Sequence, residues 1–167
     1  MVVATWLLAI VAIWGEKLLH EIFKPKLSFL EIKITPQAIN EKEEIVMYRL
    51  YLKNIARFSS AKSTRAFVSL NSSADQNRFI SIPLNWTHID GRKRDISAGE
   101  DAYLDLFKKH NNEYLWCWAH GNSPYEPAIS KLSTEKESTI RINFSDEYSM
   151  LSCVDIQFFP SGEITIL

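Results

Sequence analysis

Tryptophan side chains are the residues of this chain whose spacing best suits a binding surface. Trp116 and Trp118 flank Cys117, and Trp86 lies earlier in the chain. On a strand, Trp116 and Trp118 share one face and Cys117 takes the other. If that face meets solvent, the rings could stack on a sugar, a base or a peptide. If it faces inward, they are core residues, which is the commoner place for Trp in a β-sandwich. The candidate ligand- or partner-binding residues are therefore Trp86, Trp116 and Trp118.

The two cysteines allow either a disulfide or free thiols. Cys117 and Cys153 both fall in predicted strands, so a bridge between two sheets is possible. In a reducing compartment they would be small buried hydrophobic residues instead. The membrane orientation predicted below favours free thiols.

No spacing of residues predicts catalysis, a metal or a cofactor. The four histidines have no ligand spacing, and Cys117 and His120 are three apart in a segment predicted to be a strand. There is no Gly-x-Ser-x-Gly motif, and none of the 5 glycines adjoin to form a phosphate-binding loop. Asp101 and Asp105 form an ordinary carboxylate pair, because nothing in the sequence would separate their pKa values. We expect a protein that is not an enzyme.

Basic residues form one dense cluster and one short collar. Arg92, Lys93 and Arg94 follow a predicted turn at Asp90-Gly91, while Lys24 and Lys26 follow the N-terminal apolar run. Together they could contact anionic lipid headgroups. The alternative for the cluster is a solvated hairpin tip.

The composition bounds the class of protein. The 167 residues are 46% hydrophobic and 23% charged, which is incompatible with a disordered chain. A balance of 19 basic and 20 acidic side chains argues against a dedicated nucleic-acid binder. Two cysteines are too few for a disulfide-built mini-protein or a four-cysteine zinc module.

The N-terminal segment is the most apolar part of the chain. Residues 2–14 are apolar apart from Thr5, which gives about 20 Å of helix against a hydrocarbon core of about 30 Å. An amphipathic continuation to Phe23 extends the helix to the membrane interface, and Pro25 ends it. A cleaved signal peptide is excluded, since no Lys or Arg precedes the run and no small-residue cleavage site follows it.

Two alternatives remain for this segment, a helix of the domain core and a single membrane anchor, and we predict the anchor. Because Lys17, Lys24 and Lys26 follow the apolar run, the domain after it should face the cytoplasm. The predicted organisation is an anchor helix over 1–23, a basic linker over 24–26 and one domain over 27–167.

The rest of the chain alternates with period two, which is typical of strands. The clearest stretch runs from Val46 to Lys53, and an earlier one, over residues 30–34, ends at Thr35-Pro36. Further stretches lie at 66–70, 79–84, 102–107, 114–119, 140–144, 154–158 and 164–167. Eight or nine short strands without a confident helix after Phe23 predict an all-β fold, an antiparallel two-sheet, immunoglobulin-like sandwich. A closed barrel is the alternative.

Two motifs carry a resemblance to known proteins. The pattern from Tyr48 to Asn54, followed by alternating Ala66, Val68 and Leu70, resembles the second and third strands of bacterial adhesion-type immunoglobulin-like domains. The segments around Pro83-Leu84-x-Trp86 and 96–105 resemble uncharacterised prokaryotic membrane-anchored proteins that carry such a domain behind one short helix. The chain departs from the pattern at Ile55, where those domains turn on Gly.

These observations predict a membrane-anchored, non-enzymatic domain that binds a protein partner, with pairing along an edge strand as one route. The alternative function is a small-ligand or carbohydrate receptor that uses exposed Trp residues.

Overall fold

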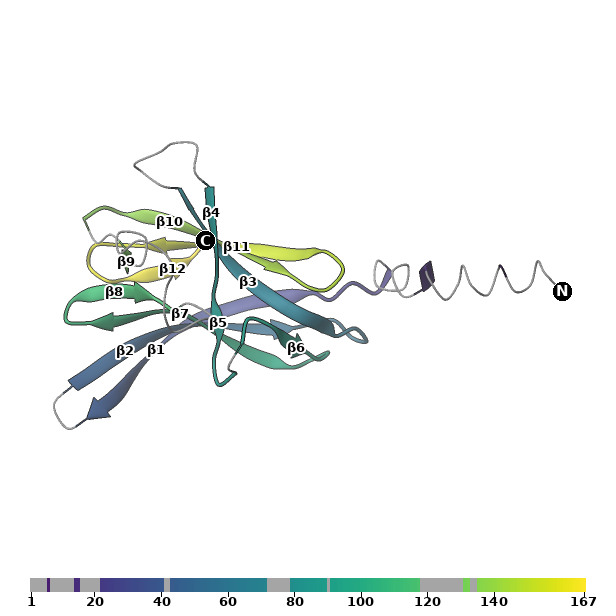
Figure 1. Ribbon diagram of the computed structural model, residues 1–167, viewed down its shortest axis with the longest axis horizontal. Helices are drawn as coiled ribbons and strands as arrows, with labels where there is room; N and C mark the ends of the chain where they lie inside the picture. Colours follow the sequence, from purple (N-terminus) through teal and green to yellow (C-terminus); the bar gives the residue numbers. More distant parts are fainter. Residues whose placement is uncertain are drawn as a thin grey trace.

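Two antiparallel β-sheets pack face to face in the computed structural model (Figure 1). The structure describes residues 6, 14–15, 22–40, 43–71, 79–89, 91–117, 131–132 and 135–167. The two packed antiparallel sheets confirm the predicted all-β, two-sheet sandwich.

The first sheet has the strand order β1-β2-β7-β8-β9, with β5 pairing with the free part of β7. Its strands are β1 (Leu27–Asn40), β2 (Glu43–Asn54), β5 (Asn85–Trp86), β7 (Asp101–His110), β8 (Glu113–Trp116) and β9 (Lys131–Leu132).

The second sheet has the order β12-β11-β10-β3-β4, with β6 pairing with the start of β3. Its strands are β3 (Ala61–Asn71), β4 (Phe79–Pro83), β6 (Arg94–Ile96), β10 (Ser138–Ser145), β11 (Met150–Phe158) and β12 (Ile164–Ile166). The described residues thus form more strands than the sequence predicted, because β5, β6 and β9 are too short to show a period.

Alternation along the strands places one side of each sheet in the core. Leu50 and Leu52 of β2 are fully buried, and so is Leu104, which lies opposite Leu50 on β7. The second sheet contributes fully buried Val68 and Ile142, which lie opposite each other on β3 and β10. Each such side chain stabilises the fold by about 1.5–3 kcal/mol relative to an exposed one.

The first strand is longer than its sequence indicated. Thr35-Pro36 was predicted to end it, but β1 continues to Asn40, and Pro36 lies opposite Val46 of β2. Proline is tolerated here because β1 is an edge strand and needs hydrogen bonds on only one side. A bulge between Phe29 and Glu31 shifts the register near the start of the strand.

One segment crosses from the second sheet to the first between β4 and β5. Leu84, at the crossing, donates its backbone N–H to the carbonyl oxygen of Ala66 at 2.9 Å. The next residue, Asn85, donates to Cys117 at 3.1 Å, so the chain has changed sheets within one step. This crossing puts the backbone of Trp86 in the first sheet while its ring faces the second.

The predicted anchor helix lies almost wholly outside the described residues. The described side chains of this segment include Trp6, Trp14, Ile22 and Phe23, which are 66%, 62%, 63% and 49% exposed. These four side chains do not pack into the sandwich core. Within the part of the chain that the structure describes, no helix combines the length and apolar character needed to cross a bilayer.

Candidate functional site

The predicted tryptophan platform is wrong for two of its three residues. Trp86 is fully buried and Trp116 is 4% exposed, so neither ring is available to a ligand. The inward side of their strands faces the opposite sheet, which is why the interior alternative holds for both. Trp118 lies outside the described residues.

Both buried rings instead have structural contacts. The indole Nε1–H of Trp86 donates to the carbonyl oxygen of Thr64 on β3 at 3.1 Å, which ties the two sheets together. Trp116 meets Phe107 edge to face, with ring centroids 5.8 Å apart. Phe107 also contacts Tyr48, at 4.8 Å between centroids, so this end of the core is an aromatic cluster.

The two cysteines are free thiols in different surroundings. Cys117 is half-buried beside Trp116, and Cys153 on β11 is exposed. Burial, together with the negative charge of Asp105, raises the pKa of Cys117 to about 12. Because the thiolate is the reactive form, Cys117 should be inert at neutral pH.

This difference predicts two classes of thiol. With an aromatic disulfide reagent at neutral pH, Cys153 should react at once and Cys117 on the order of a hundredfold more slowly or only after unfolding. Stopped-flow absorbance measures both phases, and Cys153→Ser should remove the fast phase alone. Two thiols reacting at one common rate in the folded protein would contradict the assignment.

The outer face of the first sheet carries an aromatic row that the sequence analysis missed. Tyr51 on β2 and Tyr103 on β7 lie opposite each other and stack, with centroids 4.9 Å apart and an interplanar angle of 15°. Lys33 on β1 places its Nζ 4.6 Å from the Tyr51 centroid and donates to the Tyr103 hydroxyl at 3.4 Å. The outward alternation of Tyr51 and Tyr103 was readable in the sequence, but the register that makes them neighbours was not.

The acidic groups on this face are matched by cations. Asp105 accepts from Arg49 Nε at 2.9 Å and from the Thr87 hydroxyl at 2.7 Å. Asp101 lies 3.4 Å from Lys53 Nζ. Asp101 and Asp105 therefore both take part in cross-strand ion pairs, which contribute to the stability of the sheet.

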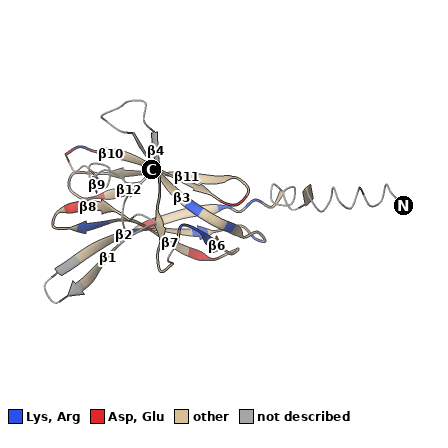
Figure 2. Cartoon of the chain, viewed as in Figure 1, with Lys and Arg blue, Asp and Glu red and all other residues tan. Residues whose placement is uncertain are grey.

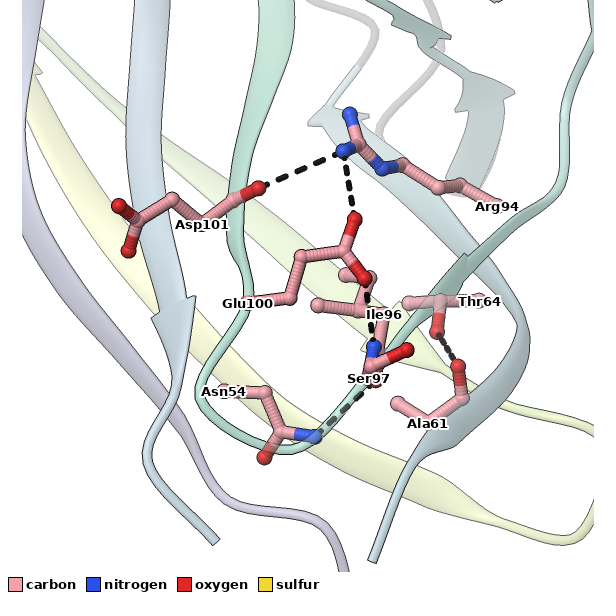
Figure 3. A network of polar contacts seen from close by, with 8 residues as sticks. All are labelled: Asn54, Ala61, Thr64, Arg94, Ile96, Ser97, Glu100 and Asp101. Carbon is pink, nitrogen blue, oxygen red and sulfur yellow. Dashed lines mark hydrogen bonds and ion pairs between the residues drawn. The ribbon is translucent and has the colours of Figure 1, made fainter.

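The basic cluster after Gly91 is divided by the fold. Arg92 and Lys93 are exposed, but Arg94 lies on β6 and is half-buried. Arg94 Nη2 contacts Glu100 Oε1 at 2.9 Å and the carbonyl oxygen of Asp101 at 3.3 Å (Figure 3). Arg94 therefore serves an internal contact, whereas Arg92 and Lys93 keep their side chains in solvent.

The partner of Arg94 is held in its charged form. Burial acts to raise the pKa of Glu100, but hydrogen bonds from the Ser97 backbone and from Arg94 outweigh it, and the pKa is lowered. Glu100 Oε2 accepts the Ser97 N–H at 2.8 Å, which closes the turn between β6 and β7 (Figure 3).

Asn54 joins three segments at the same end of the sandwich. Its side chain is fully buried, and its Nδ2 donates to the carbonyl oxygens of Ser59 at 2.8 Å and Ile96 at 3.1 Å (Figure 3 shows the second bond). Its Oδ1 accepts from the backbone N–H groups of Lys26 at 3.3 Å and Ala56 at 3.1 Å. Lys26, the last residue of the predicted linker, is thus fixed to the domain.

Within the described part of the chain, the β1 edge of the first sheet combines an open pairing side with exposed apolar side chains. Among the described residues, β2 is the only strand that pairs with β1. Leu30 and Ile34 on β1 are 48% and 56% exposed. A long edge strand with exposed apolar side chains offers its backbone to another strand.

The described residues hold no group of three or more His, Cys, Asp or Glu side chains arranged to bind a metal. No family model, curated protein or solved structure matches the chain.

Proposed function

We propose that the chain is a membrane-anchored, non-enzymatic binding domain whose sandwich takes an extended segment of a protein partner along β1. The free edge of β1, with exposed Leu30 and Ile34, carries this proposal. Strand addition supplies affinity through backbone hydrogen bonds and specificity through side chains that alternate along the added strand.

The exposed N-terminal side chains support the anchor. Trp6 and Trp14 are more than half exposed, and water is an unfavourable surrounding for rings of this size. Lys24 and Lys26 follow them, so the positive-inside rule puts the sandwich in the cytoplasm. Free Cys117 and Cys153 are compatible with that reducing compartment.

The sandwich also supports a relationship to bacterial adhesion-type immunoglobulin-like domains. The strands that carry the resemblance, β2 and β3, lie in opposite sheets and both are central to them. We therefore propose that the domain is immunoglobulin-like, with β1 as a recognition edge.

Photo-cross-linking in cells tests partner binding along β1. A benzoylphenylalanine replacing Gln37, an exposed residue of β1, should give one discrete protein adduct. The double change Leu30→Lys and Ile34→Lys should abolish it, because lysines on an edge strand oppose pairing. Both side chains are exposed, so the variant should fold.

Met150 is the matched control, since it is an exposed apolar residue of β11 in the other sheet. A cross-linker there should not give the adduct, and Met150→Lys should not remove the adduct at position 37. Equal adducts from both positions, or an adduct that survives the double change, would contradict recognition along β1.

A further inference from the structure

We propose that residues 55–60, the loop after β2, dock on the anionic headgroups of the membrane that holds the anchor. This inference rests on the anchor of the proposed function, and it assigns the domain's contact with the bilayer to a surface not identified from the sequence. The name "docking loop" is used below for residues 55–60.

The docking loop lies where the predicted anchor ends. The N–H of Ile55 donates to the carbonyl oxygen of Lys26 at 2.8 Å, and Asn54 Oδ1 accepts from the Lys26 N–H. Only two residues separate Phe23 from Lys26, and the three Cα-to-Cα steps between them span at most about 11 Å. If the anchor ends at Phe23, the docking loop is held close to the bilayer surface.

The docking loop presents the side chains that a membrane interface favours. Phe58 is 73% exposed, the highest value among the large apolar side chains that the structure describes, and Ile55 is 49% exposed. The guanidinium carbon of Arg57 lies 4.9 Å from the centroid of the Phe58 ring. This combination suits the boundary between the acyl chains and the phosphate groups of a bilayer. The aromatic ring can insert among the acyl chains while the guanidinium pairs with a lipid phosphate.

The backbone of the docking loop is ordered before any lipid binds. The buried side chain of Asn54 donates to Ser59 near one end of the loop and accepts from Ala56 near the other. Because both ends are fixed, little conformational entropy is lost when Phe58 meets a bilayer. A loop that was only a connector would not need an exposed Phe on a fixed backbone.

The surrounding charge favours an anionic bilayer as the occupant. Lys24, Lys26 and Arg57 are all exposed. Basic residues also lie on β3 (Figure 2), whose Arg65 is exposed. Arg94 of β6 is paired with Glu100 and is left out of the proposed surface.

Lipid photo-cross-linking of the full chain tests this contact. The chain is reconstituted in vesicles of phosphatidylcholine with phosphatidylserine, or of phosphatidylcholine alone, with benzoylphenylalanine at position 58. The control carries it at Gln37, which lies ten residues beyond Leu27 on β1 and so roughly 33 Å farther along the strand. Mass spectrometry measures lipid adducts, and flotation of the vesicles measures anchoring separately.

Position 58 should label lipid, position 37 should not, and the yield at 58 should be higher with phosphatidylserine. Arg57→Glu should lower that yield about fivefold or more, since one basic residue near an anionic surface contributes about that factor. A chain that floats but labels lipid equally at 58 and 37, or equally in both vesicle types, overturns the docking loop and leaves the anchor intact. A chain that does not float overturns both.

Discussion

Replacing Trp86 with alanine should destabilise the sandwich by roughly 3–5 kcal/mol, the range for truncating a large buried aromatic side chain. Trp86 is fully buried and its ring lies 6.3 Å from that of Phe144 between centroids, so the cavity would lie between the two sheets. The change also removes the donor to the Thr64 carbonyl. Because small domains are stable by only about 5–15 kcal/mol, the loss is a large share of the total.

Trp86→Phe separates the two contributions. It keeps most of the apolar surface but leaves the buried carbonyl oxygen of Thr64 without the indole donor, a loss of about 1–3 kcal/mol. Denaturant unfolding followed by far-ultraviolet circular dichroism measures both variants without relying on tryptophan fluorescence.

The matched control is Trp6→Phe, at a ring that is 66% exposed, which should change the free energy of unfolding by no more than about 0.5 kcal/mol. If Trp86→Ala were as mild as this control, the ring would not be a bridge between the sheets.

Replacing Asn54 with alanine should cost roughly 3–5 kcal/mol, because four hydrogen bonds are lost at once and their partner groups, one of them fully buried, are left behind. The partners are the carbonyl oxygens of Ser59 and Ile96 and the N–H groups of Lys26 and Ala56. Alanine cannot replace either the two donors or the acceptor of the amide. Chemical unfolding measures the loss, and hydrogen exchange should show faster exchange at the Ala56 N–H.

Asn143→Ala is the matched control for the same chemical change on a strand. The Asn143 side chain is half-buried on β10 and donates a hydrogen bond from Nδ2 to the Ser69 hydroxyl at 2.8 Å. Its loss should cost about 0.5–1.5 kcal/mol. Equal costs at positions 54 and 143 would show that the Asn54 network does not act as a junction.

The sequence pattern predicted the core strands because every second residue of a half-buried strand faces the core and is apolar. The alternation of Tyr48, Leu50 and Leu52 identified both β2 and its inward face, and those side chains are buried. The shortest strands could not be predicted in this way. β5 has two residues and β6 has three, so neither contains a full period of alternation.

The candidate sites were harder to predict because exposure depends on which strands become neighbours. Trp86 and Trp116 could not be assigned to the inside or the outside from their spacing alone. The stacking of Tyr51 on Tyr103 requires the pairing of β2 with β7, which are separated by four intervening strands in the chain. Strand pairing over such a separation is set by the packing of the whole core, which no local pattern encodes.

By itself the sequence determined the fold class, the location of the strand-forming stretches and the contrast between an apolar N-terminus and a balanced domain, because these follow from side-chain hydrophobicity read along the chain. Only the tertiary structure decided that Arg94 is paired internally, that Asn54 fixes Lys26 to the domain, and that Phe58 stays exposed beside it. These outcomes depend on contacts between segments remote in the chain, and such contacts exist only once both sheets have assembled.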